Sequence, residues 1–258
     1  MTNSELSNEF DVLYNNITSN QAPGLNEYEK SVFLTKAQAQ LVNEYFNNRT
    51  DGFGGGFDGS QKRQYDFSSI IKVDLLSELL DKELLTRGIE KIDMRSKVFI
   101  FPSDYFLAIN EIISADSDGT HIQYSVLPIN NIEYQRLMLK PYALPHKKAE
   151  WRLINRTISI TEDNTTSTHS VVECIGNFKV GSSINYTLRY IKTLNPIILD
   201  NLNTYGENVS IGGKSLETPC ELPEETHQEI LERAVVLAKM AWQGTTATQQ
   251  AIQQRDRE

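Results

Sequence analysis

The sequence has little cysteine and no cysteine motif. Its two cysteines, Cys174 and Cys220, lie far apart, and no C-x-x-C pair occurs in the 258 residues. These facts exclude a disulfide framework and a cysteine-rich zinc site, so both thiols are expected to be reduced. No run of about 18 apolar residues is present, and the N-terminal ten residues lack the basic and apolar regions of a secretory signal. We therefore expect a soluble protein made in a cytoplasm, with no membrane partner.

An excess of positive charge is also missing. The net charge is −9 and the isoelectric point is about 5.1. The summed field of such a chain repels phosphates, so general attraction to nucleic acid is not expected. One group of basic residues is either a local basic surface or an ordinary solvated segment: Arg136, Lys140, His146, Lys147, Lys148 and Arg152.

Motifs that carry chemistry are lacking too. The segment 212–215 (GGKS) resembles a phosphate-binding loop, but Asn208 replaces its required first glycine and Pro219 follows where a helix should begin, so we predict a turn. The glycine-rich segment 52–57 (GFGGGF) lacks the strand before it and the helix after it that a dinucleotide site needs. None of the four histidines has a partner at metal-ligand spacing. We predict no catalytic, cofactor or metal residues and no enzyme; a carboxylate pair assembled across distance stays open.

What the sequence does contain is enough apolar material for a core, arranged as helices at both ends. Hydrophobic residues make up 39% of the chain. A helical stripe predicts a helix near residues 2–17, a second helix is expected over 26–46, and Pro223 with the acidic residues after it predicts a third over 223–242. The first stripe consists of Leu6, Phe10, Leu13 and Ile17. The first two helices either pack as a hairpin or keep one face for a neighbouring subunit.

The middle of the chain is rich in strand patterns. Residues 67–87 predict a short strand followed by a short helix, Asp118-Gly119 predicts a hairpin turn, and Asn130 or Asn131 is expected to cap a short helix. Further strands are expected over 97–101, 105–113, 121–127, 151–161, 169–178 and 184–191. The predicted fold class is α+β, with helices at the N- and C-termini around a central antiparallel β-sheet and a flexible C-terminal tail.

The expected organisation is one domain, residues 1–242, followed by a polar extension, residues 243–258. Within the domain we expect a helical part, a flexible loop, a mixed part rich in strands and a final helix, at 1–46, 47–64, 65–222 and 223–242. The extension has too little apolar surface to fold alone, so it is either disordered or ordered by a partner.

The loop and the extension supply the predicted contacts. Phe53 and Phe57 are either anchors for a partner or fold back onto the chain's own core. Around the extension, the candidate partner or oligomer contacts are Trp242, Gln249, Gln250 and Ile252.

Three segments resemble structural proteins of crAss-like bacteriophages. They are GLNEYEKSVFLTKAQAQLVNEYF, then VLPINNIEYQRLMLKPYALPHKKAEWRLI, and then RYIKTLNPIILDNL followed by ETPCELPEETHQEILERAVVLAKMAW. The resemblance implies a portal-adaptor ring protein of the head-to-tail connector, located in the neck of the virion after synthesis in the host cytoplasm. It implies a homo-oligomer, a dodecameric ring, with the portal protein and adjacent tail ring proteins as partners. Such proteins act through surfaces, so the resemblance carries over no set of functional residues.

The resemblance also implies non-specific passage of viral DNA through the ring, without a cofactor. A ring of acidic subunits would repel DNA and let it slide. The alternatives are another neck or tail ring component, a virion-associated hydrolase, which the missing catalytic motifs disfavour, and an α+β domain that binds an unknown partner.

Overall fold

The chain forms two compact units, which we describe separately. The structure is a computed structural model, and it describes residues 1–17, 24–47, 65–79, 96–117, 120–140, 142, 144–162, 165–178, 183–206 and 209–255. One unit contains Met1–Ile70 and Leu194–Glu258, and the other contains Ile71–Thr193. We predicted one domain over 1–242 from the sequence. The division arises because the terminal segments pack on each other, while the strands between them build a separate core.

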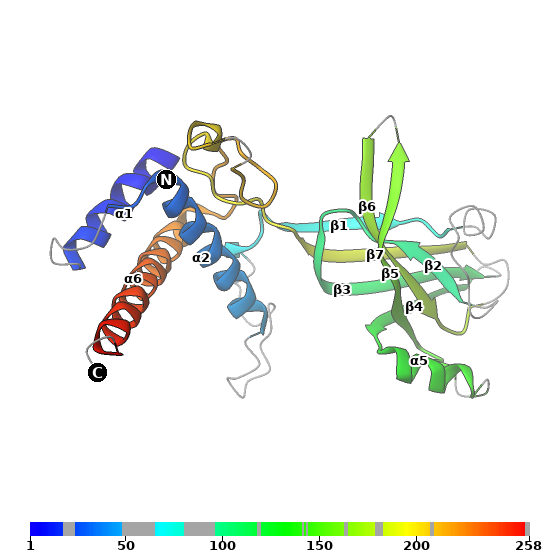
Figure 1. Ribbon diagram of the computed structural model, residues 1–258. Helices are drawn as coiled ribbons and strands as arrows, with labels where there is room; N and C mark the ends of the chain where they lie inside the picture. Colours follow the sequence, from blue (N-terminus) through cyan, green and yellow to red (C-terminus); the bar gives the residue numbers. More distant parts are fainter. Residues whose placement is uncertain are drawn as a thin grey trace. The chain divides into compact units, whose positions relative to one another are not determined.

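The first unit, which we call the helical unit, contains three long helices and an irregular segment (Figure 1). Their bounds are α1, Asn3–Ile17; α2, Glu27–Asn47; α6, Glu224–Arg255; and the short 3-10 helix η3, Leu202–Thr204. Thr2 and Glu5 begin α1 with a reciprocal cap. The N–H of Thr2 donates to the carboxylate of Glu5 at 2.8 Å, and the N–H of Glu5 donates to the hydroxyl of Thr2 at 3.3 Å. Asn26 and Glu29 begin α2 in the same way. The helices at both ends confirm the sequence prediction.

Buried apolar faces hold these helices together. On α1 the buried apolar residues are Leu6 and Phe10, as predicted, and Tyr14, which takes the place expected for the half-buried Leu13. On α2 the buried stripe passes through Leu34, Ala37 and Leu41. Val32 and Phe33, the apolar residues just before this stripe, are only half-buried. On α6 the buried positions are Ile230, Leu231, Ala234, Val235 and Ala238.

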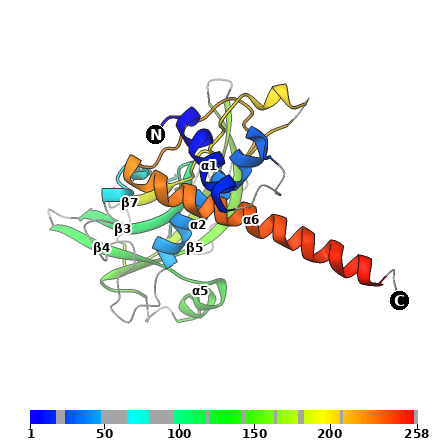
Figure 2. The same cartoon turned by 90° about the vertical axis from the view of Figure 1, so that its left-hand side faces the viewer.

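Helix α6 is longer than the sequence predicted. The expected end at residue 242 is exceeded by thirteen residues, because the helical backbone continues through Gly244 to Arg255. At 1.5 Å per residue, this extension adds about 20 Å. Figure 2 shows the C-terminal end of α6 extending well beyond α1 and α2. Among the described residues, no helix is both long enough and apolar enough to cross a membrane.

The irregular segment between residues 194 and 222 is fastened to α1 and α2 by hydrogen bonds. Ser31 accepts from the N–H of Leu199 at 3.0 Å, and Thr35 accepts from the N–H of Ile197 at 3.1 Å. The side chain of Asn3 donates to the carbonyl of Ile198 at 3.1 Å. Ile198 also pairs with Thr218 in an isolated bridge, and the helix side chains satisfy the backbone N–H groups of the residues on either side of it.

The second unit, which we call the sheet unit, is a seven-stranded sheet with one short helix. The strand order is β1-β7-β3-β4-β5-β6-β2. The bounds are β1, Ile71–Leu76; β2, Lys97–Ile100; β3, Tyr105–Ser117; β4, Thr120–Pro128; α5, Asn131–Met138; β5, Lys148–Glu162; β6, Thr165–Ile175; and β7, Ser183–Lys192.

The sheet is mixed. Five of its six strand pairs are antiparallel as predicted, but β4 and β5 run parallel over Ser125–Pro128 and Lys148–Trp151. A parallel pair needs a crossover connection rather than a hairpin, and α5 lies in this crossover. The sheet is also not a meander, because β7 lies between β1 and β3.

Large aromatic side chains fill the core of the sheet unit. The rings of Phe101 and Trp151 meet edge to face with centroids 5.5 Å apart, and those of Phe99 and Tyr186 lie 4.9 Å apart. These contacts join strands from both sides of the crossover into one apolar cluster, which also includes Cys174. The sheet therefore provides a rigid body on which α5 is mounted.

Candidate interaction surfaces

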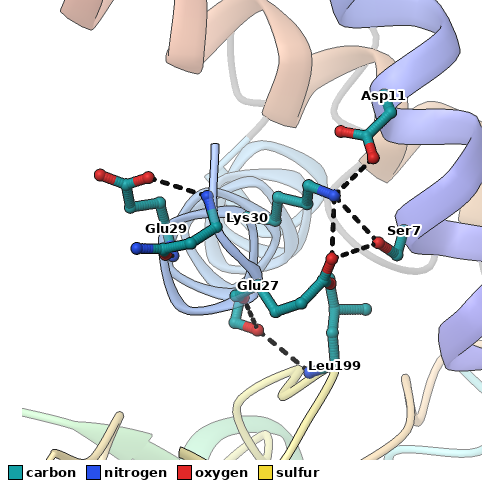
Figure 3. Close-up of polar contacts among 8 residues, drawn as sticks. Ser7, Asp11, Glu27, Glu29, Lys30 and Leu199 are labelled. Atoms are coloured by element: carbon teal, nitrogen blue, oxygen red, sulfur yellow. Dashed lines mark hydrogen bonds and ion pairs between the residues drawn. The ribbon is translucent and has the colours of Figure 1, made fainter. Parts of the chain in front are cut away.

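A buried lysine joins the first two helices of the helical unit. Lys30 on α2 is 3% exposed, and its ammonium donates to Asp11 at 2.7 Å, to Glu27 at 2.9 Å and to Ser7 at 3.0 Å (Figure 3). Burial alone would lower the pKa of Lys30, but the hydrogen bonds and charges of Asp11 and Glu27 outweigh it and raise the pKa. All three ammonium protons thus have acceptors, and two of these acceptors lie on α1. The cluster fixes the packing of α1 on α2.

The predicted contact residues lie in different parts of the chain. Phe53 and Phe57 lie outside the described residues. Trp242 is half-buried on α6. The other three candidates, Gln249, Gln250 and Ile252, fall in the extension of α6 beyond residue 242, within its helical backbone. These three residues therefore lie on continuous helical backbone rather than in the predicted flexible tail.

The first half of α6 presents a separate exposed stripe. Glu225 and Glu232 are exposed, and Val236 and Met240 continue the same face with exposures of 47% and 63%. Their spacing of seven, four and four residues places them along one line on the helix surface. The stripe is acidic at its start and apolar at its end.

Helix α5 of the sheet unit exposes large apolar side chains. Asn130 caps the helix, accepting from the N–H of Glu133 at 2.8 Å while Glu133 accepts from the N–H of Asn130. This confirms the predicted cap. Tyr134 is the buried residue of α5, whereas Ile132 and Leu139 are 65% and 81% exposed. An eight-residue helix that buries so little is available for contact on its outer side.

The six basic residues singled out in the sequence divide into two groups. Arg136, Lys140, His146, Lys147 and Lys148 are exposed around α5 and the start of β5. Of these, Lys148 pairs with Glu150, and His146 contacts the side-chain nitrogen of Asn177 at 3.3 Å. Arg152 is different, because it turns into the unit. The structure thus supports a local basic surface built from five of the six residues.

Arg152 forms a buried ion pair beneath α5. Its guanidinium donates to Glu173 at 3.2 Å and lies 4.6 Å from the centre of the Tyr134 ring. Glu173 is completely buried and also accepts a hydrogen bond from Ser96. The pair links β5 to β6 and, through the cation–π contact, to α5. It therefore fixes how α5 stands on the sheet.

A buried carboxylate lies in the aromatic core of the sheet unit. Glu111 on β3 is 5% exposed, and one of its oxygens accepts from the indole N–H of Trp151 at 2.6 Å and from the hydroxyl of Tyr186 at 2.8 Å. Burial raises the pKa of Glu111 to about 7, although both hydrogen bonds oppose the shift. The side chain can bind or release a proton near neutral pH, and no second group arranged for catalysis accompanies it among the described residues.

The segment that resembles a phosphate-binding loop is a turn, as predicted. Gly212 and Gly213 have φ angles of 56° and 78°, which only glycine adopts readily, and Ile211 and Lys214 pair across them. The ammonium of Lys214 donates to the side chain of Asn195 at 2.5 Å. Over the described part of the chain, no group of three or more histidine, cysteine or acidic residues is placed to hold a metal ion.

The exposed face of α5 was missed in the sequence. The segment was treated only as a basic one, although Ile132 and Leu139 stand seven residues apart around Arg136 on the predicted helix. That spacing places all three on one side, which was the available signal. What the spacing could not give is whether that side faces the core or the solvent.

Comparison with known proteins identifies relatives over the whole chain. A family model described as phage tail ring protein 3/4 matches residues 1–250. The chain is 44% identical over 256 residues to Ring protein 4/5 of Bacteroides phage crAss001, which covers 99% of both chains. It is 32% identical over 244 residues to Ring protein 3 of the same phage, covering 92% of this chain and 95% of that protein. The matches span both compact units.

Proposed function

The chain belongs to the phage tail ring protein 3/4 family, and from this premise we propose that it is a structural, non-enzymatic virion protein that forms a ring in the head-to-tail connector. In this role it links the portal to the tail and surrounds the DNA exit channel. The observation that carries the proposal is the 44% identity to a ring protein over 99% of both chains. Subunits are made in the host cytoplasm and assembled in the neck of the particle.

The proposed ring is a dodecamer that touches the portal on one side and the adjacent tail ring proteins on the other. A ring of identical subunits needs a head-to-tail contact that closes by rotation. The net charge of −9 per subunit supports a channel that repels DNA and lets it pass without binding.

The position of the ring is tested by cross-linking intact virions and by electron microscopy of the same particles. For the portal adaptor we expect cross-links between this chain and the portal protein, and density with twelve copies directly below the portal. Cross-links to tail proteins without any to the portal would contradict the adaptor position. A virion without this chain would overturn the structural role itself.

A second position, a ring lower in the tail, is favoured by one observation. The family description names a tail ring protein, and both relatives carry ring numbers of three or above. This candidate predicts the opposite cross-linking pattern, with neighbours on both sides drawn from the tail.

The extension of α6 is proposed to contact a neighbouring protein in the particle. The residues concerned are Trp242 and, on the helical extension, Gln249, Gln250 and Ile252. The extension reaches about 20 Å past residue 242, so it can span the distance to a neighbour.

Removing residues 245–258 tests this contact. The shortened chain keeps every apolar residue that the structure describes as buried in the helical unit, so its thermal midpoint should stay within a few degrees of the full chain's. Its incorporation into virions should fall by roughly tenfold or more, as expected when about 1.4 kcal/mol of contact energy is lost. A chain that lacks only residues 256–258 is the matched control. Normal incorporation of the shorter chain would refute the contact.

A further inference from the structure

The two units divide the charge of the chain unequally. The sheet unit, residues 71–193, has fifteen basic and fifteen acidic residues and is neutral. The helical unit has ten basic and nineteen acidic residues, so it carries the whole net charge of −9. Within the neutral sheet unit, four exposed lysine and arginine residues and His146 gather around α5 and the start of β5. One unit is therefore acidic, and the other has a basic surface at α5.

The same two units carry exposed apolar side chains beside these charges. On α5, Ile132 and Leu139 flank Arg136 on one side of the helix, and Lys140 follows directly. On α6, Val236 and Met240 follow Glu232 on one side of that helix. Apolar residues on an outer helix face stabilise a contact by burial, and the adjacent charges select the partner.

We propose that the exposed face of α5 in one subunit packs against the exposed stripe of α6 in a second copy of the chain, forming the lateral contact of the ring. In the antiparallel orientation Lys140 and Arg136 meet Glu232, and Ile132 and Leu139 cover Met240 and Val236. This inference rests on the proposed ring and adds to it which surfaces meet.

A ring contact requires two different surfaces of one chain that complement each other, and these two surfaces do so in charge, in apolar content and in length. The eight residues of α5 span about 12 Å, and the rise from Glu232 to Met240 is also about 12 Å. Because one surface lies on each unit, every subunit offers both, and the contact can repeat around a closed ring.

Charge reversal tests the contact in particles. A host strain supplies the variant chain to a phage that lacks its own copy, and incorporation into virions is measured. We expect Arg136→Glu with Lys140→Glu to reduce incorporation by roughly tenfold or more, because like charges then face each other. Glu225→Lys with Glu232→Lys should do the same from the other side. All four positions are exposed, so circular dichroism should show each variant folded as the wild type.

Supplying the α5 variant and the α6 variant together is the decisive experiment. Each junction in an alternating ring then joins either two wild-type surfaces or two reversed surfaces, so incorporation should return to within about threefold of the wild-type level. One chain that carries all four reversals should also be restored. If only that single chain were restored and the mixture were not, α5 and α6 would contact each other within one subunit, and the proposal would be wrong.

The control is Lys36→Glu, a charge reversal at an exposed position that belongs to neither surface, which should incorporate normally. Failure of the proposed virion role can be distinguished from failure of the α5–α6 contact. If the wild-type chain itself is not incorporated, the proposed virion role fails. If the wild-type chain and both reversed variants are incorporated equally, the ring stands and the α5–α6 contact is refuted.

Discussion

Replacing Arg152 by methionine should lower the free energy of unfolding of the sheet unit by about 3–5 kcal/mol. Glu173 is fully buried, and the change removes the guanidinium that lies 3.2 Å from its carboxylate. Methionine keeps most of the side-chain volume, so the expected loss is mainly electrostatic. The contact with the Tyr134 ring is lost as well, which should loosen α5 on the sheet.

The effect can be isolated by removing both partners. Arg152→Met combined with Glu173→Gln has no buried charge and still leaves an acceptor for Ser96. Since replacing both members of a buried pair by neutral groups is often nearly neutral, the double variant should recover most of the lost stability. Urea unfolding followed by circular dichroism measures all variants. Lys147→Met, an exposed position, should change stability by less than about 0.5 kcal/mol. A single variant as stable as the wild type would show that the pair contributes nothing.

The sequence predicted the helices and strands of this fold better than it predicted which strands lie side by side. The cap at Asn130 and the helical stripe of α1 depend on residues within a few positions of each other, so the local sequence is enough to predict them. The position of β7 between β1 and β3 depends on contacts more than sixty residues apart along the chain. Alternation within a strand shows which face is buried but does not show which strand lies beside it.

The C-terminal end of α6 was predicted wrongly for a different reason. Residues 243–255 were expected to be disordered or partner-bound because they have little apolar surface. Helix hydrogen bonds are local, however, and α6 is already nucleated by its packed first half, so each added residue contributes its own bond. Apolar content predicts whether a segment packs, and it does not by itself predict where a nucleated helix ends.

The buried charged residues had a signal that was not used. Glu111 falls in the inward-facing series of β3 with Ile113 and Ala115, where a charge is unexpected. Lys30 stands four residues before Leu34, at the head of the buried stripe of α2. A charged residue in an apolar series indicates a buried polar site. Its partners, such as Trp151 for Glu111, lie on other strands and could only be identified from the structure.

Glu111 should make the sheet unit less stable as the pH rises through neutrality. Burial raises its pKa to about 7 in the folded chain, against about 4.5 when unfolded. The folded state therefore holds the proton more tightly. Its contribution is complete below about pH 4.5 and is lost as the pH passes 7, a total of about 3 kcal/mol at 1.36 kcal/mol per pKa unit. The groups that face it, Tyr186 and Cys174, have pKa values raised by burial, so they stay neutral in this range.

Glu111→Gln should remove this dependence, because the amide oxygen still accepts from Trp151 and Tyr186 but cannot ionise. The change in unfolding free energy between pH 5 and pH 8 should become smaller by about 2.5 kcal/mol than in the wild type, because part of the total is already lost at pH 5. All chains carry Trp242→Phe, so that the fluorescence of Trp151 reports on the sheet unit alone. Glu9→Gln, at an exposed glutamate, is the control and should keep the wild-type difference. An unchanged difference in Glu111→Gln would mean that Glu111 is ionised in the folded protein throughout this range, and that Trp151 and Tyr186 stabilise the carboxylate enough to offset its burial.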